Sequence, residues 1–417
     1  MLGATISCLK GNRTRLWSAL ILITLAPFAA AQDPASAPAS HTSEQIGTVQ
    51  QVYDGKLLPD VQVNTFRHID RLFPSRTVAH GAKVYPLAVS DKPLRDVVFD
   101  SAGKQVDLFD YISLNRVSGL LVIKNGKIAY ENYELGNTPE TRWMSMSIAK
   151  SITASLIAAA IKDGYIKSID DPITRYLPKL NGSAYEGVTV RQLLQMASGV
   201  QWKETYTDPN SDRRHMLQVQ SAQQDGAVLD LMAKLPRVAA PGTRWNYSTG
   251  ETQVAGALVS AAVGKSESAY LSEKIWAKFG MESDATWWLE SANGGEIGGS
   301  GIAATLRDYG RFGLFLLEDG MVDGERVLPE GWVKEASSPQ TIGGQQVDYG
   351  YMLWPVPRSA GSIHASAFEA RGIFGQHIYM NPAQKLVIVV WSARSKPSGT
   401  PPVADHDFFA AVARTLQ

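Results

Sequence analysis

The sequence has a single cysteine, Cys8, among its 417 residues. That cysteine lies in an N-terminal segment that we expect to be removed, so the remaining chain is predicted to contain neither a disulfide nor a thiol nucleophile. The chain also lacks the H-E-x-x-H pair of many zinc hydrolases, the G-x-S-x-G turn of α/β-hydrolases and the G-x-x-x-x-G-K-[ST] loop that binds phosphates. These absences argue against three common kinds of hydrolytic site.

Metal-binding and nucleic-acid-binding patterns are missing as well. The seven histidines, among them His215, His364, His377 and His406, show no paired ligand spacing. The glycines between residues 294 and 313 match no phosphate-binding pattern and predict turns. Lysines and arginines number 40, as do aspartates and glutamates, so no charge excess favours a nucleic-acid partner. No metal or cofactor is predicted.

No apolar run is long enough for a membrane span. The longest near the N-terminus, residues 16–28, contains Pro27 and falls short of the roughly 20 residues that a span needs. Three basic residues precede it and three alanines follow it, which is typical of a secretory signal covering residues 1–31. A retained membrane anchor is the alternative. We expect an exported bacterial protein, periplasmic or secreted, with no stable membrane insertion after cleavage.

Beyond the signal, two segments precede the expected catalytic domain. Residues 32–48 are rich in proline, alanine and serine and predict a flexible spacer. Residues 49–104 carry scattered apolar side chains between turns and predict an irregular leader packed on the domain. The sequence gives no function for this leader.

The rest of the chain mixes strands and helices. Residues 120–123 and 128–130 flank Asn125-Gly126, a strong hairpin signal because both residues tolerate positive φ. Residues 386–391 are continuously apolar and predict a central strand. Helices are expected at 147–163, near 226–234, 251–263 and 267–279, and at 403–416.

Strands at both ends of residues 105–417, with helices between them, predict one α/β (α+β) unit assembled from its beginning and its end. A mostly helical subdomain at about 170–290 would be inserted in it. The active site is expected at the seam between the two parts.

Ser147 and Lys150 form an S-x-x-K pattern at the start of the most apolar predicted helix. A helix places residues i and i+3 on one face, so the hydroxyl and the amine can meet. Burial disfavours the ammonium form of a lysine and would make Lys150 a proton acceptor for the weakly nucleophilic serine. The free N–H groups at the start of the helix can stabilise an oxyanion.

The S-x-x-K pattern alone is weak, since it also occurs at residues 7–10 and 101–104. An alternative is that Ser147 is only a helix N-cap and Lys150 a solvated side chain. Further segments in the expected order add specificity, namely MSMSIAKSIT, VTVRQLLQMASGVQWKETYTDPNSD, WNYSTGETQVAG, GSGIAATLRDYGRFGLFLLEDG and ARGIFGQHIYMNP.

Together these segments resemble the serine β-lactamase and penicillin-recognising superfamily, and most closely its class C type esterases and 6-aminohexanoate-dimer hydrolases, over about residues 105–417. The resemblance implies a β-lactamase/transpeptidase-like fold with a central antiparallel sheet flanked by helices. It implies Ser147 as nucleophile, Lys150 as its proton acceptor and Tyr247 as the tyrosine that passes protons to the leaving group. We expect Lys150 to favour phenolate character at Tyr247.

The resemblance also implies the remaining site. The family's K-T-G element aligns with residues 370–372, which places Gly372 against the substrate and the Ile373 N–H, with that of Ser147, in the oxyanion hole. The alignment can slip toward Gln376, which is a second substrate-side candidate. Tyr206 matches a position that contacts the scissile amide in the dimer hydrolases.

Two departures bear on the substrate. Thr249 stands where the family commonly has asparagine, and it is a further substrate-binding candidate. Ala370 replaces the lysine or histidine that helps to bind a penicillin carboxylate. We therefore expect a serine hydrolase of small esters or linear amides. A β-lactamase, a peptidoglycan D,D-carboxypeptidase and a non-catalytic penicillin-binding-like protein are the alternatives, and the oligomeric state stays open.

Overall fold

The computed structural model describes residues 43–357, 359 and 361–417. The predicted signal, residues 1–31, and residues 32–42 of the predicted spacer lie outside the described residues. Within the described part, no helix combines the length and the apolar character needed to cross a bilayer.

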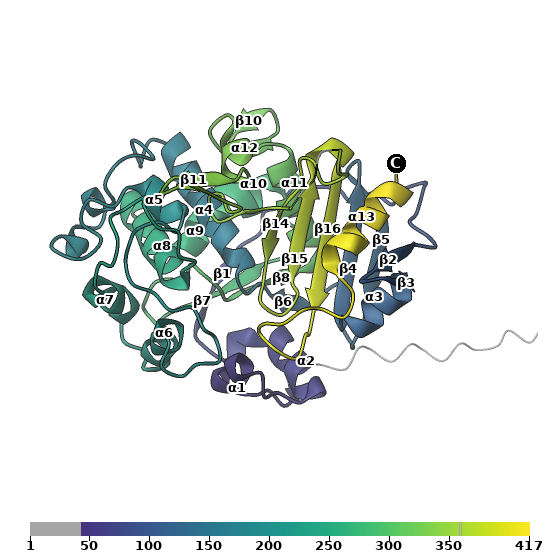
Figure 1. The fold of residues 1–417 in the computed structure, drawn as a ribbon, viewed down its shortest axis with the longest axis horizontal. Coiled ribbons are helices and arrows are strands. Elements are labelled where there is room, and N and C mark those ends of the chain that lie inside the picture. The colour runs from purple at the N-terminus through teal and green to yellow at the C-terminus, as the bar shows by residue number, and fades with distance from the viewer. Residues whose placement is uncertain (1–42, 358, 360) are drawn as a thin grey trace, which may run out of the picture. The chain divides into compact units, whose positions relative to one another are not determined.

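The central element is a six-stranded antiparallel sheet (Figure 1). Its strands, in spatial order, are β13 (Trp354–Pro355), β14 (Phe368–Arg371), β15 (His377–Asn381), β16 (Leu386–Ser392), β4 (Val117–Lys124) and β5 (Lys127–Tyr133). The hairpin between β4 and β5 turns at Asn125 and Gly126, both at positive φ. β4 also pairs with β16, with Leu121 opposite Val389. This confirms the prediction of a sheet assembled from both ends of the domain.

Side chains alternate between two buried faces of this sheet. Leu121 and Val389 belong to the larger core, with α11 (Leu306–Leu317). Leu120 and Val390 belong to a second core, with α3 (Leu108–Leu114) and α13 (Asp405–Thr415). Helices therefore cover both faces (Figure 1).

A second, four-stranded antiparallel sheet was not predicted. Its order is β1 (Ser75–Val78), β7 (Ala285–Trp288), β8 (Ile302–Thr305) and β6 (Arg142–Met144). β7 and β8 are buried at every position, so their sequences lack the apolar–polar alternation of a half-exposed strand. Two-stranded ribbons complete the strands: β2 (Val98–Ser101) with β3 (Lys104–Asp107), β9 (Met321–Val322) with β10 (Glu325–Arg326), and β11 (Gln340–Ile342) with β12 (Gln345–Val347).

The middle of the chain is helical, as predicted. α4 (Ile148–Lys162) is buried through most of its length and packs against α8 (Thr249–Val263). The helix expected at 267–279 is α9 (Glu267–Leu271), followed by one π turn (Ser272–Trp276) and α10 (Ala277–Phe279). The other helices here and beyond are α5 (Val190–Leu194), α6 (Asp212–Ser221), α7 (Ala227–Lys234) and α12 (Trp332–Ala336).

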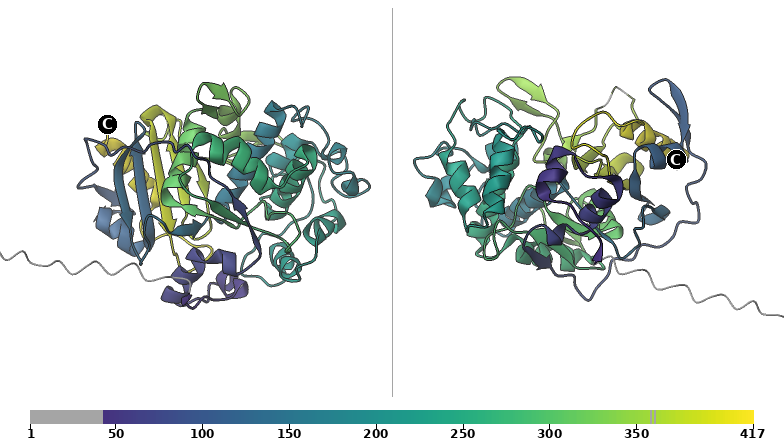
Figure 2. Two further views of the ribbon diagram at one scale, coloured as in Figure 1. Left: turned by 180° about the vertical axis from the view of Figure 1, so that it is seen from behind. Right: turned by 90° about the horizontal axis from the view of Figure 1, so that it is seen from below.

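The leader begins with two helices, α1 (Val49–Asp54) and α2 (Pro59–Arg67). Seen from below, they lie where the helical region meets the sheet (Figure 2, right). Phe66 of α2 is fully buried and packs on Trp143 and Phe374, with ring centroids 5.7 and 4.9 Å away. Asp54 pairs with Arg214 of α6 at 2.7 Å. The leader thus joins the same core as the catalytic part of the chain.

Candidate active site

Ser147 follows strand β6 by one tight turn. Ser145 is fixed to β8 by two hydrogen bonds with Ile302, its N–H donating at 2.7 Å and its hydroxyl accepting at 3.1 Å. Met146 then adopts a left-handed conformation with φ 43°, a strained geometry for a side chain with a Cβ. This turn places Ser147 at the start of α4 with its side chain partly exposed.

Ser147 does not cap the helix. It occupies the N-cap position of α4, but its side chain makes no capping hydrogen bond. Its hydroxyl lies instead 3.0 Å from the amine nitrogen of Lys150. The simple capping role considered for Ser147 is therefore not observed, and neither is a solvated Lys150, since that side chain is 2% exposed.

Lys150 is surrounded by three oxygen atoms. Its Nζ lies 3.0 Å from Ser147 Oγ, 3.0 Å from Thr249 Oγ1 and 2.9 Å from the carbonyl oxygen of Gly299. A neutral amine has two N–H donors and one lone pair. If the donors bind the Thr249 hydroxyl and the Gly299 carbonyl, the lone pair is left for the hydroxyl proton of Ser147.

Burial provides the neutral amine that this arrangement needs. It lowers the pKa of Lys150 to about 7, against a partial upward effect of the Glu204 charge and a further downward effect of Arg213. An amine with a pKa near the working pH is suited to general base catalysis. Lys150 can therefore accept the proton of Ser147 at neutral pH.

Tyr247 lies close to Lys150, in the loop before α8. The amine of Lys150 lies 5.3 Å from the centre of the Tyr247 ring, and the side chain of Ser147 is close enough to the phenol to affect its pKa. Burial and the negative charge of Glu204 raise the pKa of Tyr247, and together they outweigh the downward effects of the Ser147 side chain and of the Arg371 and Arg213 charges. The expected phenolate character was wrong, because desolvation outweighs the nearby positive charges. The raised pKa favours the neutral phenol form of Tyr247.

Glu204 was missed by the sequence analysis. Its carboxylate accepts hydrogen bonds from the N–H of Thr249 at 2.9 Å, from the Thr249 hydroxyl at 2.5 Å and from the indole of Trp202. Thr249 therefore links Lys150 to Glu204. The only available signal was that Glu204 and Gly299 both lie within segments that carry the family resemblance.

Thr249 contacts Lys150 and Glu204 and not the space expected for a substrate. Its side chain is 2% exposed, and its hydroxyl is engaged by Lys150 and Glu204. We therefore assign it to positioning Lys150 and correct its assignment as a substrate-binding residue.

The turn between β14 and β15 lies against the nucleophile. A Cβ on Gly372 would come within 2.8 Å of the Ser145 carbonyl oxygen and 3.0 Å of the Met146 Cβ. This close approach needs a glycine, and Ile373 is the next residue of the turn. Among the described residues, no acceptor binds the backbone N–H of Ser147 or of Ile373. Both N–H groups are available to an oxyanion.

Gln376 supports this turn from inside. The side chain is fully buried, and its Oε1 accepts a hydrogen bond from the Phe374 N–H at 3.0 Å. Its Nε2 is buried without a hydrogen-bond partner, and its assignment as a substrate-binding residue stays a prediction. The position of Gly372 against Ser145 and Met146 agrees with the first of the two alignments, and the oxyanion role of Ile373 stays a prediction.

Aromatic side chains border the site. Tyr206 is partly exposed and stacks on Tyr53 of the leader, with ring centroids 6.4 Å apart. The Trp354 ring lies 5.5 Å from that of Tyr247 and 4.6 Å from that of Tyr349. The guanidinium of Arg371 covers Trp354 at 3.9 Å. Of these rings, those of Tyr206, Tyr247 and Trp354 are partly exposed, whereas those of Tyr53 and Tyr349 are buried.

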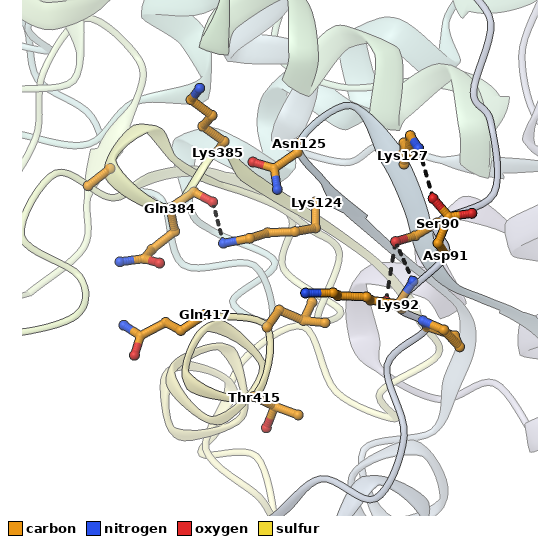
Figure 3. A pocket seen from close by; sticks show the side chains of 13 residues that line it. Ser90, Asp91, Lys92, Lys124, Asn125, Lys127, Gln384, Lys385, Thr415 and Gln417 are labelled. Atoms are coloured by element: carbon orange, nitrogen blue, oxygen red, sulfur yellow. Dashed lines mark hydrogen bonds and ion pairs between the residues drawn. The ribbon is translucent and has the colours of Figure 1, made fainter.

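A hollow elsewhere on the molecule does not belong to the site. It has a volume of about 770 Å³ and is lined by residues of the β4–β5 hairpin, the β15–β16 connection and the C-terminus (Figure 3). Of its lysines, Lys124 donates to the Gln384 carbonyl and Lys127 pairs with Asp91. None of the residues around Ser147 lines it. The contact between Ser147 and Lys150, and not this hollow, therefore identifies the candidate active site.

Comparison with known proteins agrees with this geometry. The chain is 28% identical to the 6-aminohexanoate-dimer hydrolase of Paenarthrobacter ureafaciens over 305 residues, which cover 70% of this chain and 76% of the relative. Among solved structures, a Bacillus anthracis protein described as a 6-aminohexanoate-dimer hydrolase superposes with a TM-score of 0.73 at 23% identity, covering 86% of this chain and 92% of the other.

A D-alanine carboxypeptidase of Burkholderia cenocepacia superposes with a TM-score of 0.53 at 17% identity, covering 74% of this chain and 96% of the other. These likenesses confirm the expected penicillin-binding-like α/β fold. The sequence pattern of the beta-lactamase family matches residues 115–411, which is more than half of the chain. With the Ser147 hydroxyl and the Lys150 amine in contact at the start of α4 and the Tyr247 phenol close by, this chain belongs to the beta-lactamase family.

Proposed function

We propose that the protein is a serine hydrolase that cleaves carboxylic esters or linear amides through an acyl-enzyme on Ser147. The observation that carries this proposal is the buried Lys150, whose lone pair can take the Ser147 proton while Thr249 and Gly299 bind its two hydrogens. Hydrolysis as such follows from the family. The choice of ester or linear amide is the finer part of the proposal.

The reaction proceeds in two stages. Ser147 Oγ attacks the carbonyl carbon while its proton passes to Lys150, and the oxyanion accepts hydrogen bonds from the N–H groups of Ser147 and Ile373. As the tetrahedral intermediate collapses, the proton moves from Lys150 to the leaving group by way of the Tyr247 phenol. Water then attacks the acyl-enzyme and gives a proton to Lys150; as the second tetrahedral intermediate collapses, Lys150 returns that proton to Ser147 Oγ and the acid is released.

Two observations favour linear substrates over β-lactams. Ala370 is buried and offers no cation at the position where the family commonly has one for a penicillin carboxylate. The relative with 28% identity is named for the hydrolysis of a linear amide dimer. A β-lactamase or a D,D-carboxypeptidase would use the same catalytic groups, and the fold likeness to a D-alanine carboxypeptidase keeps that activity as the second candidate.

Export is a separate proposal. The pattern of residues 1–31 supports removal of a signal before Gln32. Protein recovered from the periplasm or medium of a bacterial host should begin at Gln32. An N-terminus at Met1 in that fraction would contradict cleavage.

The nucleophile can be tested by covalent labelling. A fluorophosphonate should label the wild-type protein and fail to label Ser147→Ala, because only an activated serine reacts readily. Ser155→Ala on the same helix is the matched control and should label normally, since that hydroxyl only donates to the Ser151 carbonyl at 2.8 Å. Equal labelling of wild type and Ser147→Ala would reject the nucleophile.

Substrate choice needs a panel. Nitrocefin, p-nitrophenyl esters, linear amides of aminohexanoate and a D-alanyl-D-alanine peptide should be compared by kcat/KM. Highest activity on the esters or linear amides supports the proposal. Highest activity on nitrocefin or on the D-alanyl peptide would replace it with the second candidate.

A further inference from the structure

Arg213 is a buried cation that the mechanism above does not use. It is the second residue of α6, and its side chain is 2% exposed. One guanidinium nitrogen, Nη1, is buried without a hydrogen-bond partner. No carboxylate of the described residues lies within ion-pair distance of it, whereas its neighbour Arg214 pairs with Asp54 at 2.7 Å.

The leader holds Arg213 in place. Nη2 donates a hydrogen bond to the phenol oxygen of Tyr53, and the guanidinium lies 4.4 Å from the centre of the Tyr53 ring. The same ring stacks on Tyr206. A side chain of α1 therefore fixes the guanidinium beside a residue that borders the active site.

Arg213 acts on the catalytic groups as well. Its positive charge lowers the pKa of Lys150 and works against the upward shifts of the pKa values of Tyr206 and Tyr247. The charge is therefore close enough to the site to be felt by the base and by the phenol.

Burying the Arg213 guanidinium without a counter-ion lowers the stability of the folded protein. A guanidinium keeps its proton at any working pH, and a buried charge without a counter-ion is destabilising. The first turn of a helix carries partial positive charge and disfavours a cation further. The backbone N–H of Arg213 donates a hydrogen bond to the backbone carbonyl of Lys203 at 3.2 Å, and this contact gives the guanidinium no negative partner. An anion brought by the substrate would supply the missing partner.

We propose that Arg213 binds a carboxylate of the substrate through its unpartnered Nη1, so that the enzyme prefers esters or amides that carry a negative charge away from the scissile bond. This inference rests on the proposed function and adds the substrate class. Arg213 is then a specificity-determining residue, and Tyr53 of the leader positions it.

Charge and access are compatible with an anionic substrate. Arg371 already has the Glu369 carboxylate 3.4 Å away, and the oxygens of Glu204 are occupied by Thr249 and Trp202, which leaves Arg213 as the cation without a counter-ion. Nη1 is closed to solvent, so the adjoining loop, residues 201–210, must shift to admit the anion. That loop contains no helix or strand.

Matched substrates test this preference in the full-length protein. The p-nitrophenyl monoesters of succinate, glutarate and adipate place a carboxylate on the acyl side, and the butyrate, valerate and hexanoate esters are neutral counterparts. N-acetyl-6-aminohexanoate and its methyl amide place the charge on the leaving-group side instead. We expect wild type to favour the anionic member of at least one pair about tenfold or more in kcat/KM, as for a hydrogen bond to a charged group.

Arg213→Met should remove that preference. We expect kcat/KM for the favoured anionic substrate to fall about 10- to 100-fold. At pH 8.5 the neutral substrate should be little affected, because Lys150 is then largely neutral in both proteins. Arg213→Lys retains the charge and should retain part of the preference. Arg371→Met is the matched control, since it removes another nearby cation that already has Glu369 3.4 Å away.

Each result decides the inference. Equal rates for anionic and neutral substrates in wild type would overturn it, as would an equal loss on both in Arg213→Met or a preference lost only in Arg371→Met. If Arg213→Met fails to fold, competitive inhibition of wild type decides, and glutarate should inhibit where glutaramide does not. If the wild-type protein is labelled by a fluorophosphonate but shows no preference for anionic substrates, only this inference is rejected. If it is not labelled, the proposed function is rejected.

Discussion

At the scale of single residues, the chemistry depends on the protonation state of Lys150. Burial lowers the pKa of this lysine to about 7, so the amine is increasingly neutral above that pH and charged below it. Protonation removes the lone pair that accepts the Ser147 proton.

The pH dependence follows with a definite sign. We predict that kcat/KM for a neutral ester falls below pH 7, by about tenfold per unit, because one protonation disables the base. The measurement is a pH–rate profile between pH 5 and 9, with circular dichroism at each pH to show that the protein stays folded. A profile that is flat from pH 5.5 to 8 would contradict the assigned base.

Glu204 provides a second test at this scale. Its negative charge raises the pKa of Lys150, so Glu204→Gln should shift the acid limb of the profile to lower pH. The amide can still accept hydrogen bonds from Thr249, which limits structural damage. Arg213→Met removes a positive charge and should shift the limb to higher pH. Shifts of the same sign in both variants would show that these charges do not act on the base.

The sequence could predict the catalytic residues only where spacing carries the chemistry. Ser147 and Lys150 are three apart on one helix, and Tyr247 lies in a segment that matches the family. Glu204 and Arg213 reach the site from a loop and from a helix start, so no local pattern signals them. The state of Tyr247 was mispredicted because burial, which a sequence shows poorly, outweighs the neighbouring charge.

At the scale of elements, the turn between β14 and β15 completes the oxyanion hole only if it can approach Ser145 closely. We predict that Gly372→Ala lowers kcat by about 100- to 1000-fold, as expected for loss of one oxyanion donor. The added Cβ would lie 2.8 Å from the Ser145 carbonyl oxygen. Gly295→Ala is the control, since nothing lies within 4 Å of its added Cβ. Comparable activity of the two variants would remove this turn from the mechanism.

Elements with strong local signals were predicted and those without were not. The Asn125-Gly126 hairpin, the buried helix α4 and the apolar strand β16 each show their periodicity or turn chemistry in the sequence. Strands β7 and β8 are short and buried on both faces, so no alternation marks them. The position of α1 beside α6 depends on tertiary contacts such as Asp54 with Arg214, which local sequence does not reveal.

At the scale of the whole molecule, the leader and the catalytic part share one core. We predict that Phe66→Ala lowers the free energy of unfolding by about 3–5 kcal/mol, because the ring is fully buried between Trp143 and Phe374. Urea unfolding followed by tryptophan fluorescence measures this loss.

The matched control is Leu58→Ala at the start of α2, where the side chain is 73% exposed. This change should alter stability by no more than about 0.5 kcal/mol. A Phe66→Ala protein as stable as the Leu58→Ala protein would show that the leader is not part of the cooperative core.

The family pattern starts at residue 115, yet Tyr53 reaches the guanidinium of Arg213 from far upstream. A recombinant fragment limited to residues 115–411, which match the family pattern, would keep Ser147, Lys150 and Tyr247 and lose this contact. Conversely, grafting the leader of one homologue onto the body of another would exchange the residue that contacts Arg213 without altering Ser147, Lys150 or Tyr247. The 5′ end of the gene is thus a natural place to engineer which substrates this scaffold accepts.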